Sequence, residues 1–289
     1  MIDIVVLNYN DSDTTMQFLT KVEPYKIVDR IVVVDNCSTD DSLIKFRKIN
    51  SPKVSIIQTS HNGGYGAGNN FGIRYLYNHY HPEFILLSNP DVIVEESVIE
   101  DMVNFLCHHN DYAIVAPFML DLHKNRQFNT AFRVPQVKEY ILSMGVLYSK
   151  FVKPFYYKDI ETDSSGFKQV GSVSGSMFLM RTDAMIKYGM FDENIFLYCE
   201  EVVLGIKMKR AKQNVGLLLD KSFIHNHSVS INKSYKSQVA KRKLLNKSKM
   251  YVISHYYKCN GFLLCVAHLL DKISLVETWL LSILKGNNE

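Results

Sequence analysis

Residues 31–40 read IVVVDNCSTD, a run of apolar residues that gives way at once to polar ones. The same pattern recurs at 2–10, 54–70 and 84–91, where a mainly apolar run ends in polar or glycine-rich sequence. Short apolar runs that alternate with helical stretches indicate a parallel sheet buried on both faces. We therefore predict an α/β fold with a mostly parallel central sheet and helices on both faces. In such sheets ligands bind beyond the carboxyl ends of the strands, where the four polar clusters are expected.

The composition excludes several classes of protein. The chain has 289 residues, of which 47% are hydrophobic and 21% charged, which excludes disorder, collagen and a small disulfide scaffold. Its five cysteines contain no C-x-x-C pair, so neither a zinc cluster nor a secreted disulfide framework is expected, and a reducing cytosol fits best. The first seven residues read as a strand rather than a signal peptide.

The glycine-rich stretch 62–70 does not match a dinucleotide-binding fingerprint. Gly64 and Gly66 would require a third glycine at 69, where the chain has Asn69. Two interpretations remain, plain backbone flexibility or close approach of the backbone to a phosphate or sugar.

Four acidic or imidazole positions could carry chemistry, and each has a structural alternative. Asp35 could bind a nucleobase or ribose, or act as a turn residue. Asp91, after Asn89-Pro90, suits a hard divalent cation but also a simple turn. Glu200-Glu201 could supply a general base or favour the dipole of the helix that follows. We expect His225 to follow a strand over 215–219 and a turn at Asp220; it could bind metal or phosphate, or lie on the surface as an ordinary histidine.

Taken in order, these clusters resemble family 2 glycosyltransferases over roughly residues 2–231. Each motif alone is weak, but seven occur in the family's order. The matching segments are 6–10, 32–40, 61–72, 87–91, 173–181, 189–201 and His225 with Ser230. The Asn89-Pro90-Asp91 form is similar to that of rhamnosyl- and galactofuranosyltransferase-like members.

The resemblance implies a nucleotide-diphosphosugar transferase fold and an inverting single displacement. Glu201, or Glu200 in its place, would take the proton from the acceptor hydroxyl. Asp91, with His225, would hold Mg²⁺ or Mn²⁺. The nucleotide-sugar (a UDP- or dTDP-sugar) would be bound by Asn8, Asp35, Asn36, Asn62, Gly64, Asn70 and Asn89. Ser174, Gly175 and Ser176 would line the acceptor pocket.

One departure from the family pattern leaves an alternative open. The family commonly has E-D-x-D, whereas this chain has Glu200-Glu201-Val202-Val203. Glutamate is one methylene longer than aspartate, and Val203 removes a carboxylate. A catalytically silent nucleotide-sugar-binding or scaffold protein of the same fold is therefore the second hypothesis. A nucleotidyltransferase or dehydrogenase is the third, and the failed glycine spacing argues against the dehydrogenase.

The charge changes sign along the chain. Residues 1–206 carry a balance of −7, whereas 207–258 carry 13 basic side chains and one acid, Asp220. We expect a catalytic domain over 1–232, with a nucleotide-binding half (1–117) and an acceptor half (118–232). A helical tail over 233–289 follows.

The tail predicts a basic helix at 236–258 and an apolar stretch at 261–284 that charged residues interrupt. No transmembrane helix is expected. The pattern suits peripheral contact of 236–284 with an anionic membrane at the cytoplasmic face, and a lipid-linked acceptor in capsule or O-antigen synthesis. The alternative is a helix pair packed on the body or in a homodimer. No nucleic-acid-reading module is recognisable.

Overall fold

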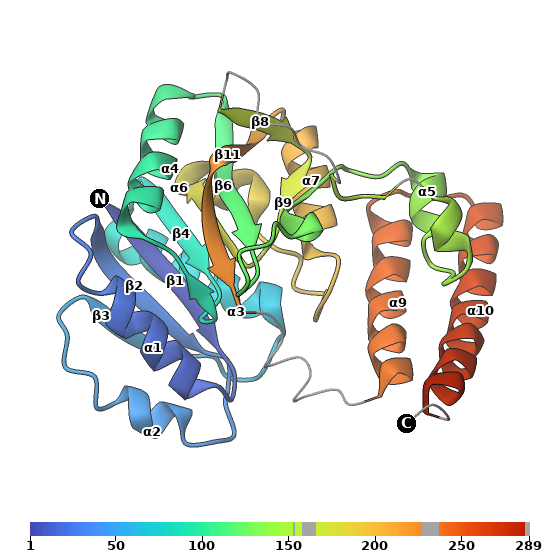
Figure 1. Cartoon of the computed structure of the whole chain (residues 1–289), viewed down its shortest axis with the longest axis horizontal. Coiled ribbons are helices and arrows are strands. Elements are labelled where there is room, and N and C mark those ends of the chain that lie inside the picture. The colour runs from blue at the N-terminus through green and yellow to red at the C-terminus, as the bar shows by residue number, and fades with distance from the viewer. Residues whose placement is uncertain (153, 158–165, 227–236, 287–289) are drawn as a thin grey trace.

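A nine-stranded mixed sheet forms the centre of the protein (Figure 1). The computed structural model describes residues 1–152, 154–157, 166–226 and 237–286, with side chains to residue 284. Eight of the strands follow the order β3 (Val54–Gln58), β2 (Val28–Asp35), β1 (Ile2–Asn8), β4 (Phe84–Ser88), β10 (Met177–Arg181), β6 (Tyr112–Leu120), β11 (Asn214–His225) and β5 (Val92–Ile93). The ninth, β8 (Phe167–Val170), pairs with β11.

The predicted, mostly parallel sheet is confirmed. Strands β1 to β4 are parallel, and β6 and β11 are parallel to each other. The register places Asn8 opposite Asp35 and Val6 opposite Ser88, so the polar strand ends meet at one edge. Strand β10 runs antiparallel between β4 and β6.

One local prediction is wrong. Asp220 was expected in a turn between Leu219 and His225, but β11 continues through it from Asn214 to His225. Its pairing with β6 shifts register between Leu218 and Ser222, so the extra residues are absorbed as an irregularity within the strand.

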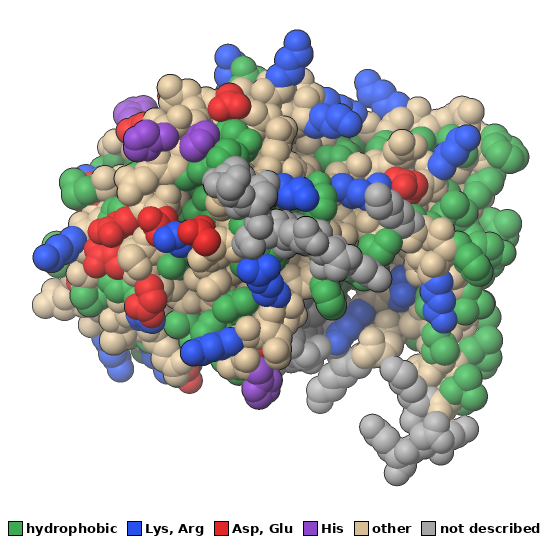
Figure 2. All heavy atoms as spheres, turned by 45° about the horizontal axis from the view of Figure 1, so that its top comes forward, with side chains coloured by type: hydrophobic (Ala, Val, Ile, Leu, Met, Phe, Trp, Pro, Cys, Tyr) green, Lys and Arg blue, Asp and Glu red, His purple; other side chains and the backbone are tan. Residues whose placement is uncertain are grey.

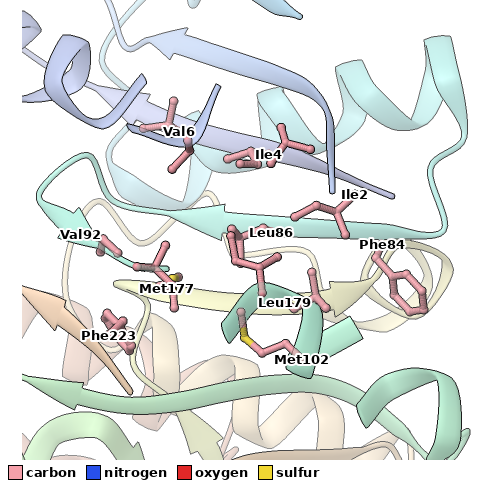
Figure 3. Close-up of a cluster of buried hydrophobic side chains, with 14 of the residues drawn as sticks. Ile2, Ile4, Val6, Phe84, Leu86, Val92, Met102, Met177, Leu179 and Phe223 are labelled. Atoms are coloured by element: carbon pink, nitrogen blue, oxygen red, sulfur yellow. The ribbon is translucent and has the colours of Figure 1, made fainter. Parts of the chain in front are cut away.

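Alternate residues of the central strands bury opposite faces of the sheet. Ile4 and Val6 of β1 face a cluster shared with α1 (Ser12–Val22), α2 (Ser42–Phe46) and α4 (Glu96–His108), part of which Figure 3 shows. Val5 faces the opposite cluster, with α3 (Tyr65–Tyr80), α6 (Thr182–Ala184), η3 (Met185–Gly189) and α7 (Glu200–Arg210). Because both faces are buried, the strands read as continuous apolar runs.

The predicted C-terminal helices are present. Helices α9 (Gln238–His255) and α10 (Gly261–Gly286) lie side by side at one end of the molecule (Figure 1, right). With α5 (Val137–Leu142) and α7 they form a third buried cluster, which includes Ile141, Val203, Ile253 and Leu270. Within the described ranges, no helix has both the length and the apolar composition needed to cross a bilayer.

Three sequence predictions involve residues outside the described ones. They are the domain boundary at 232/233, the motif residue Ser230, and the start of the basic helix at Lys236. The smaller elements between β6 and β10 are η1 (Phe128–Thr130), β7 (Ala131–Phe132), η2 (Tyr148–Phe151) and β9 (Ser172–Val173), and β7 pairs with β9.

Candidate active site

A cavity of about 680 Å³ opens at the polar edge of the sheet. Its lining combines parts of the chain that are far apart in sequence. The body contributes Asn89, Ser174, Gly175, Ser176, Glu200, Glu201 and His225, whereas α9 contributes Leu245 and Lys249. The predicted acceptor and catalytic residues therefore share one space.

The predicted nucleoside-binding residues Asn8 and Asp35 form a buried hydrogen-bond network at the ends of β1 and β2, and neither of them lines this cavity. Asn8 Nδ2 donates to Asp35 Oδ1 (3.1 Å), and Asp35 Oδ2 accepts from the Ser38 amide (3.1 Å) and Gln58 Nε2 (3.2 Å). Thr15 Oγ1 donates to Asn8 Oδ1 (2.9 Å), which fixes the orientation of that amide. The network holds the ends of β1 and β2 in one rigid arrangement.

The glycine-rich segment is held by the same edge. Asn36 Nδ2 donates to Asn62 Oδ1 (2.9 Å) and to the Gly64 carbonyl (3.1 Å). Gly64 has φ +90°, and a Cβ there would lie 2.0 Å from the Phe196 carbonyl oxygen. Only glycine fits at this position, because both the left-handed backbone and the close approach exclude a side chain.

Asn70 joins α3 to the segment that precedes the candidate base. Its Nδ2 donates to the Phe191 carbonyl and to Glu193 Oε1, both at 2.9 Å, and its Oδ1 accepts from the Phe191 amide. Both ends of the side-chain amide thus contact protein, and a role in donor binding stays a prediction.

Glu200 and Glu201 begin α7 after two consecutive left-handed residues, Tyr198 (φ 71°) and Cys199 (φ 74°). Such backbone is costly for non-glycine residues and occurs often at functional sites. Here it turns the chain so that both carboxylates reach the cavity. The positive end of the helix dipole partly offsets their charge.

The two carboxyls have altered acidity. Burial, together with the Glu201 charge, raises the pKa of Glu200, and burial raises the pKa of Glu201. The Gly175 amide lies 3.5 Å from Glu201 Oε1, while Tyr65 OH donates to the Gly175 carbonyl at 2.5 Å. A carboxyl whose pKa is raised toward neutrality suits proton transfer, because it accepts a proton readily at physiological pH.

The structure also accounts for the missing carboxylate at 203. Val203 is buried in the third cluster, together with Ile253 of α9. A charged side chain there would lose its hydration without a partner, so the departure from E-D-x-D follows from the packing of the C-terminal helices.

Asp91 and His225 meet although 134 residues separate them in the sequence. His225 Nε2 lies 3.0 Å from Asp91 Oδ1, and the Asn226 amide donates to the Asp91 carbonyl at 3.0 Å. The pairing of β11 with β5 sets His225 opposite Val92 and so aligns the two side chains. His225 lines the cavity.

This pair fits part of a divalent-cation site. Carboxylate oxygen and imidazole nitrogen are both ligands that Mn²⁺ accepts, and Mg²⁺ takes the oxygen. No group of three or more potential metal ligands occurs among the described residues, so diphosphate oxygens and water would complete the coordination.

A family model matches most of the sheet and its polar edge. The model described as Glycosyl transferase family 2 covers residues 3–189, well over half of the chain. The chain belongs to glycosyl transferase family 2. The match ends before Glu200, so membership does not rest on the candidate base.

Two curated relatives of this glycosyltransferase are named as a hexosyltransferase and a rhamnosyltransferase. The low-salt glycan biosynthesis hexosyltransferase Agl10 of Haloferax volcanii is 24% identical over 230 residues, which span 79% of this chain and 68% of that protein. The rhamnosyltransferase WbbL of Escherichia coli strain K12 is 24% identical over 219 residues, which span 73% and 78% of the respective chains.

Solved structures share the fold at low identity. GalNAc-T7 with UDP, GalNAc and Mn²⁺ superposes with a TM-score of 0.61 at 11% identity, over 80% of this chain and 44% of that one. The mannosyltransferase PcManGT of Pyrobaculum calidifontis, in complex with GDP-Man and Mn²⁺, gives 0.58 at 13% identity over 96% and 72%.

Two residues of this family 2 enzyme were missed as site residues from sequence. Lys249 lies in the cavity, where its Nζ donates to the carbonyl (2.7 Å) and Oγ (3.0 Å) of Ser143. Burial lowers the pKa of Lys249 to about 8. The other is Tyr65, which is half-buried, lines the same cavity and donates to the Gly175 carbonyl. Only its place in the motif 61–65 signalled it.

Proposed function

We propose that this glycosyltransferase moves a hexose from a UDP- or dTDP-sugar to a saccharide acceptor on a lipid carrier, with inversion at the anomeric carbon. The observation that carries the proposal is the shared cavity of about 680 Å³, which is lined by both Glu201 and His225, the latter hydrogen-bonded to Asp91. That volume lies within the range of small-molecule sites. The relatives in glycan synthesis support a role in bacterial surface polysaccharide, such as capsule or O-antigen.

The proposed reaction is a single displacement. Glu201 takes the proton from the acceptor hydroxyl while that oxygen forms a bond to the anomeric carbon. The bond between this carbon and the diphosphate oxygen breaks, and the nucleoside diphosphate leaves with the electron pair. Glu200, whose pKa is raised by burial and by Glu201, carries a proton for part of the time, which limits repulsion between the two carboxylates.

Each substrate, and the metal ion, has its own proposed binding residues. Asn8, Asp35, Asn36, Asn62, Gly64, Asn70 and Asn89 position the nucleotide-sugar, and Ser174 to Ser176 line the acceptor side. Asp91 and His225 would hold Mg²⁺ or Mn²⁺, which when bound neutralises the charge of the departing diphosphate. The complexes of GalNAc-T7 with UDP and Mn²⁺ and of PcManGT with GDP-Man and Mn²⁺ support this arrangement.

A thermal-shift screen tests the donor assignment. We expect one nucleotide-sugar to raise the melting temperature, and Mn²⁺ to increase that rise, because a ligand that binds only the folded state stabilises it. His225→Ala should abolish the Mn²⁺-dependent part, whereas His108→Ala, at an exposed site on α4, should not.

Release of nucleoside diphosphate in the presence of a lipid-linked saccharide then tests transfer. Turnover supports the proposal, whereas donor binding without turnover on any acceptor favours the silent scaffold. No thermal shift with any nucleotide-sugar contradicts both hypotheses. We place the enzyme at the inner face of the plasma membrane, where such a carrier is accessible.

A further inference from the structure

Helix α10 has both of its carboxylates and Ser274 turned toward the protein, whereas His268 and Lys272 are exposed. Asn246 Nδ2 of α9 donates to Asp271 Oδ1 (2.8 Å) and Ser274 Oγ (2.7 Å). The Val146 amide donates to Glu277 Oε2 at 2.6 Å. Both acidic residues of the helix are therefore engaged by the body, along with the buried Ala267 and Leu270.

The outward face of α10 is apolar instead. Phe262, Leu269, Val276 and Ile283 follow one another at seven-residue intervals, so they lie along one side of the helix. Large apolar side chains of α10 that are 41–75% exposed are Phe262, Leu269, Val276, Trp279, Leu280, Leu281, Ile283 and Leu284. A 26-residue helix is about 39 Å long, so this stripe is extensive. Hydrophobic side chains gather along this edge of the molecule (Figure 2, right).

The apolar stripe is joined to a segment that also lines the proposed catalytic cavity. The bond from the Val146 amide to Glu277 joins α10 to the segment 142–152, which includes η2. In that segment Leu142, Leu147, Tyr148 and Phe151 are exposed, and Phe151 is 89% exposed. Ser149 and Val152 of the same segment line the cavity. We call the outward side chains of α10 and the exposed ones of 142–151 the apolar edge.

Charges around the apolar edge favour an anionic partner. Lys272 is exposed between Leu269 and Val276, and Lys243 and Lys247 are exposed on the neighbouring α9. The inward bonds of Asp271 and Glu277 keep carboxylates off the outward face. Basic side chains near an anionic lipid surface strengthen the attachment of a protein to that surface.

We propose that the apolar edge docks on an anionic lipid bilayer, with α10 lying flat in the membrane interface. An interfacial helix buries its apolar face among the acyl chains and keeps its polar face toward the protein. The inference deepens the proposed function and rests on it in one respect, since a cavity that opens beside the bilayer receives a lipid-linked acceptor directly.

A second copy of the chain is the competing occupant. The seven-residue spacing would also suit a helix–helix seam. A helix–helix seam would not explain the exposed Leu147 and Phe151 in the segment 142–152. Nor would it explain the excess of basic side chains over residues 207–258. Docking on a bilayer accounts for the apolar stripe of α10, for the exposed side chains of 142–151 and for the basic side chains.

The single tryptophan of the chain, Trp279, lies in the apolar edge, so native fluorescence tests the proposal without labelling. The full-length protein is titrated with vesicles of phosphatidylglycerol and phosphatidylcholine, and with phosphatidylcholine alone. We expect a blue shift of Trp279 emission that is larger with the anionic vesicles, and quenching by lipids brominated in the acyl chains. Unchanged emission and no quenching would overturn the proposal.

A matched pair of variants separates lipid contact from misfolding. Leu269→Ser should weaken vesicle co-sedimentation severalfold, because one aliphatic side chain no longer enters the lipid. Ile44→Ser, equally exposed on α2, should have no effect. Equal binding by both variants, with unchanged circular dichroism, would contradict the proposal.

The remaining outcomes are also decisive. A lipid-independent blue shift that grows with protein concentration, with a dimer in light scattering, would assign the edge to a second copy and overturn bilayer docking. Vesicle binding requires no sugar donor. A protein that binds vesicles but never releases nucleoside diphosphate would therefore support the docking surface and contradict the proposed function.

Discussion

Glu200 and Glu201 are adjacent carboxyls that a fold would normally separate or expose. Here the left-handed residues Tyr198 and Cys199 turn both into the cavity, where burial and mutual repulsion make ionisation costly. The cost is tolerable because the pair can retain a proton, and that proton is what a general base exchanges. The two side chains are therefore expected to respond differently to removal of charge.

Glu200→Gln should stabilise the protein at alkaline pH. When the pKa of a carboxyl is higher in the folded state than in the unfolded state, the free energy of unfolding of the protein falls as pH rises from the unfolded-state pKa to the folded-state pKa. Glutamine does not titrate, so the variant does not lose this stability. We expect the melting temperature of the variant to exceed that of the wild type by roughly 2 °C or more at pH 9.

The gain should become small near pH 4, where Glu200 is protonated in the folded state and mostly protonated in the unfolded state. Glu100→Gln, at an exposed position on α4, serves as the control and should show no pH-dependent gain. A constant difference at all pH values would contradict the raised pKa.

Helix α9 shows how an element outside the sheet shapes the site. Its inner face places Lys249 in the cavity and Ser248 against the Leu197 carbonyl (2.7 Å), while Lys247 points to solvent. The segment 197–201 is thus braced by a helix some 50 residues later in the chain.

Lys249→Met should impair use of the acceptor and spare the donor. The variant keeps the length of the side chain but removes a cation that lines the cavity and donates to Ser143. We expect this cation also to donate a hydrogen bond to the bound acceptor, and loss of a charged hydrogen bond costs about 1.5–3 kcal/mol, or about tenfold or more in kcat/KM for the acceptor. Lys247→Met is the matched control two residues away. Identical kinetics for both variants, or loss of the nucleotide-sugar thermal shift, would show that Lys249 has no acceptor-side role.

At the scale of the whole molecule, local sequence predicts some features and not others. The parallel strands and their polar ends were predictable, because each apolar run and its polar terminus are contiguous. The insertion of β10 between β4 and β6 was not predictable from local sequence, because it depends on the pairing of 177–181 with strands some 90 and 65 residues earlier. The Asp220 turn failed because tertiary pairing of β11 with β6 overrode a local turn signal.

The C-terminal helices were predictable as helices but not as part of the site. In helix α10 the acidic residues point inward and large apolar residues point outward. In the usual amphipathic helix the apolar residues mark the packed face, so the sequence pattern alone would assign the wrong face to the protein interior. Lys249 sits in a run of basic residues that reads as solvent-exposed. Only the packing against Ser143 separates it from its neighbours.

We propose that the cavity lined by Glu201 and His225 brings together the general base and, through the Asp91–His225 pair, the group that binds the donor diphosphate. The most direct test is the rate of nucleoside diphosphate release by Glu201→Gln, measured with saturating donor and acceptor, alongside the donor-induced thermal shift. We predict a rate loss of about 10²–10⁴-fold with the thermal shift retained, as removal of a general base requires. A Glu201→Gln variant that turns over at the wild-type rate would contradict the role of Glu201 as the general base.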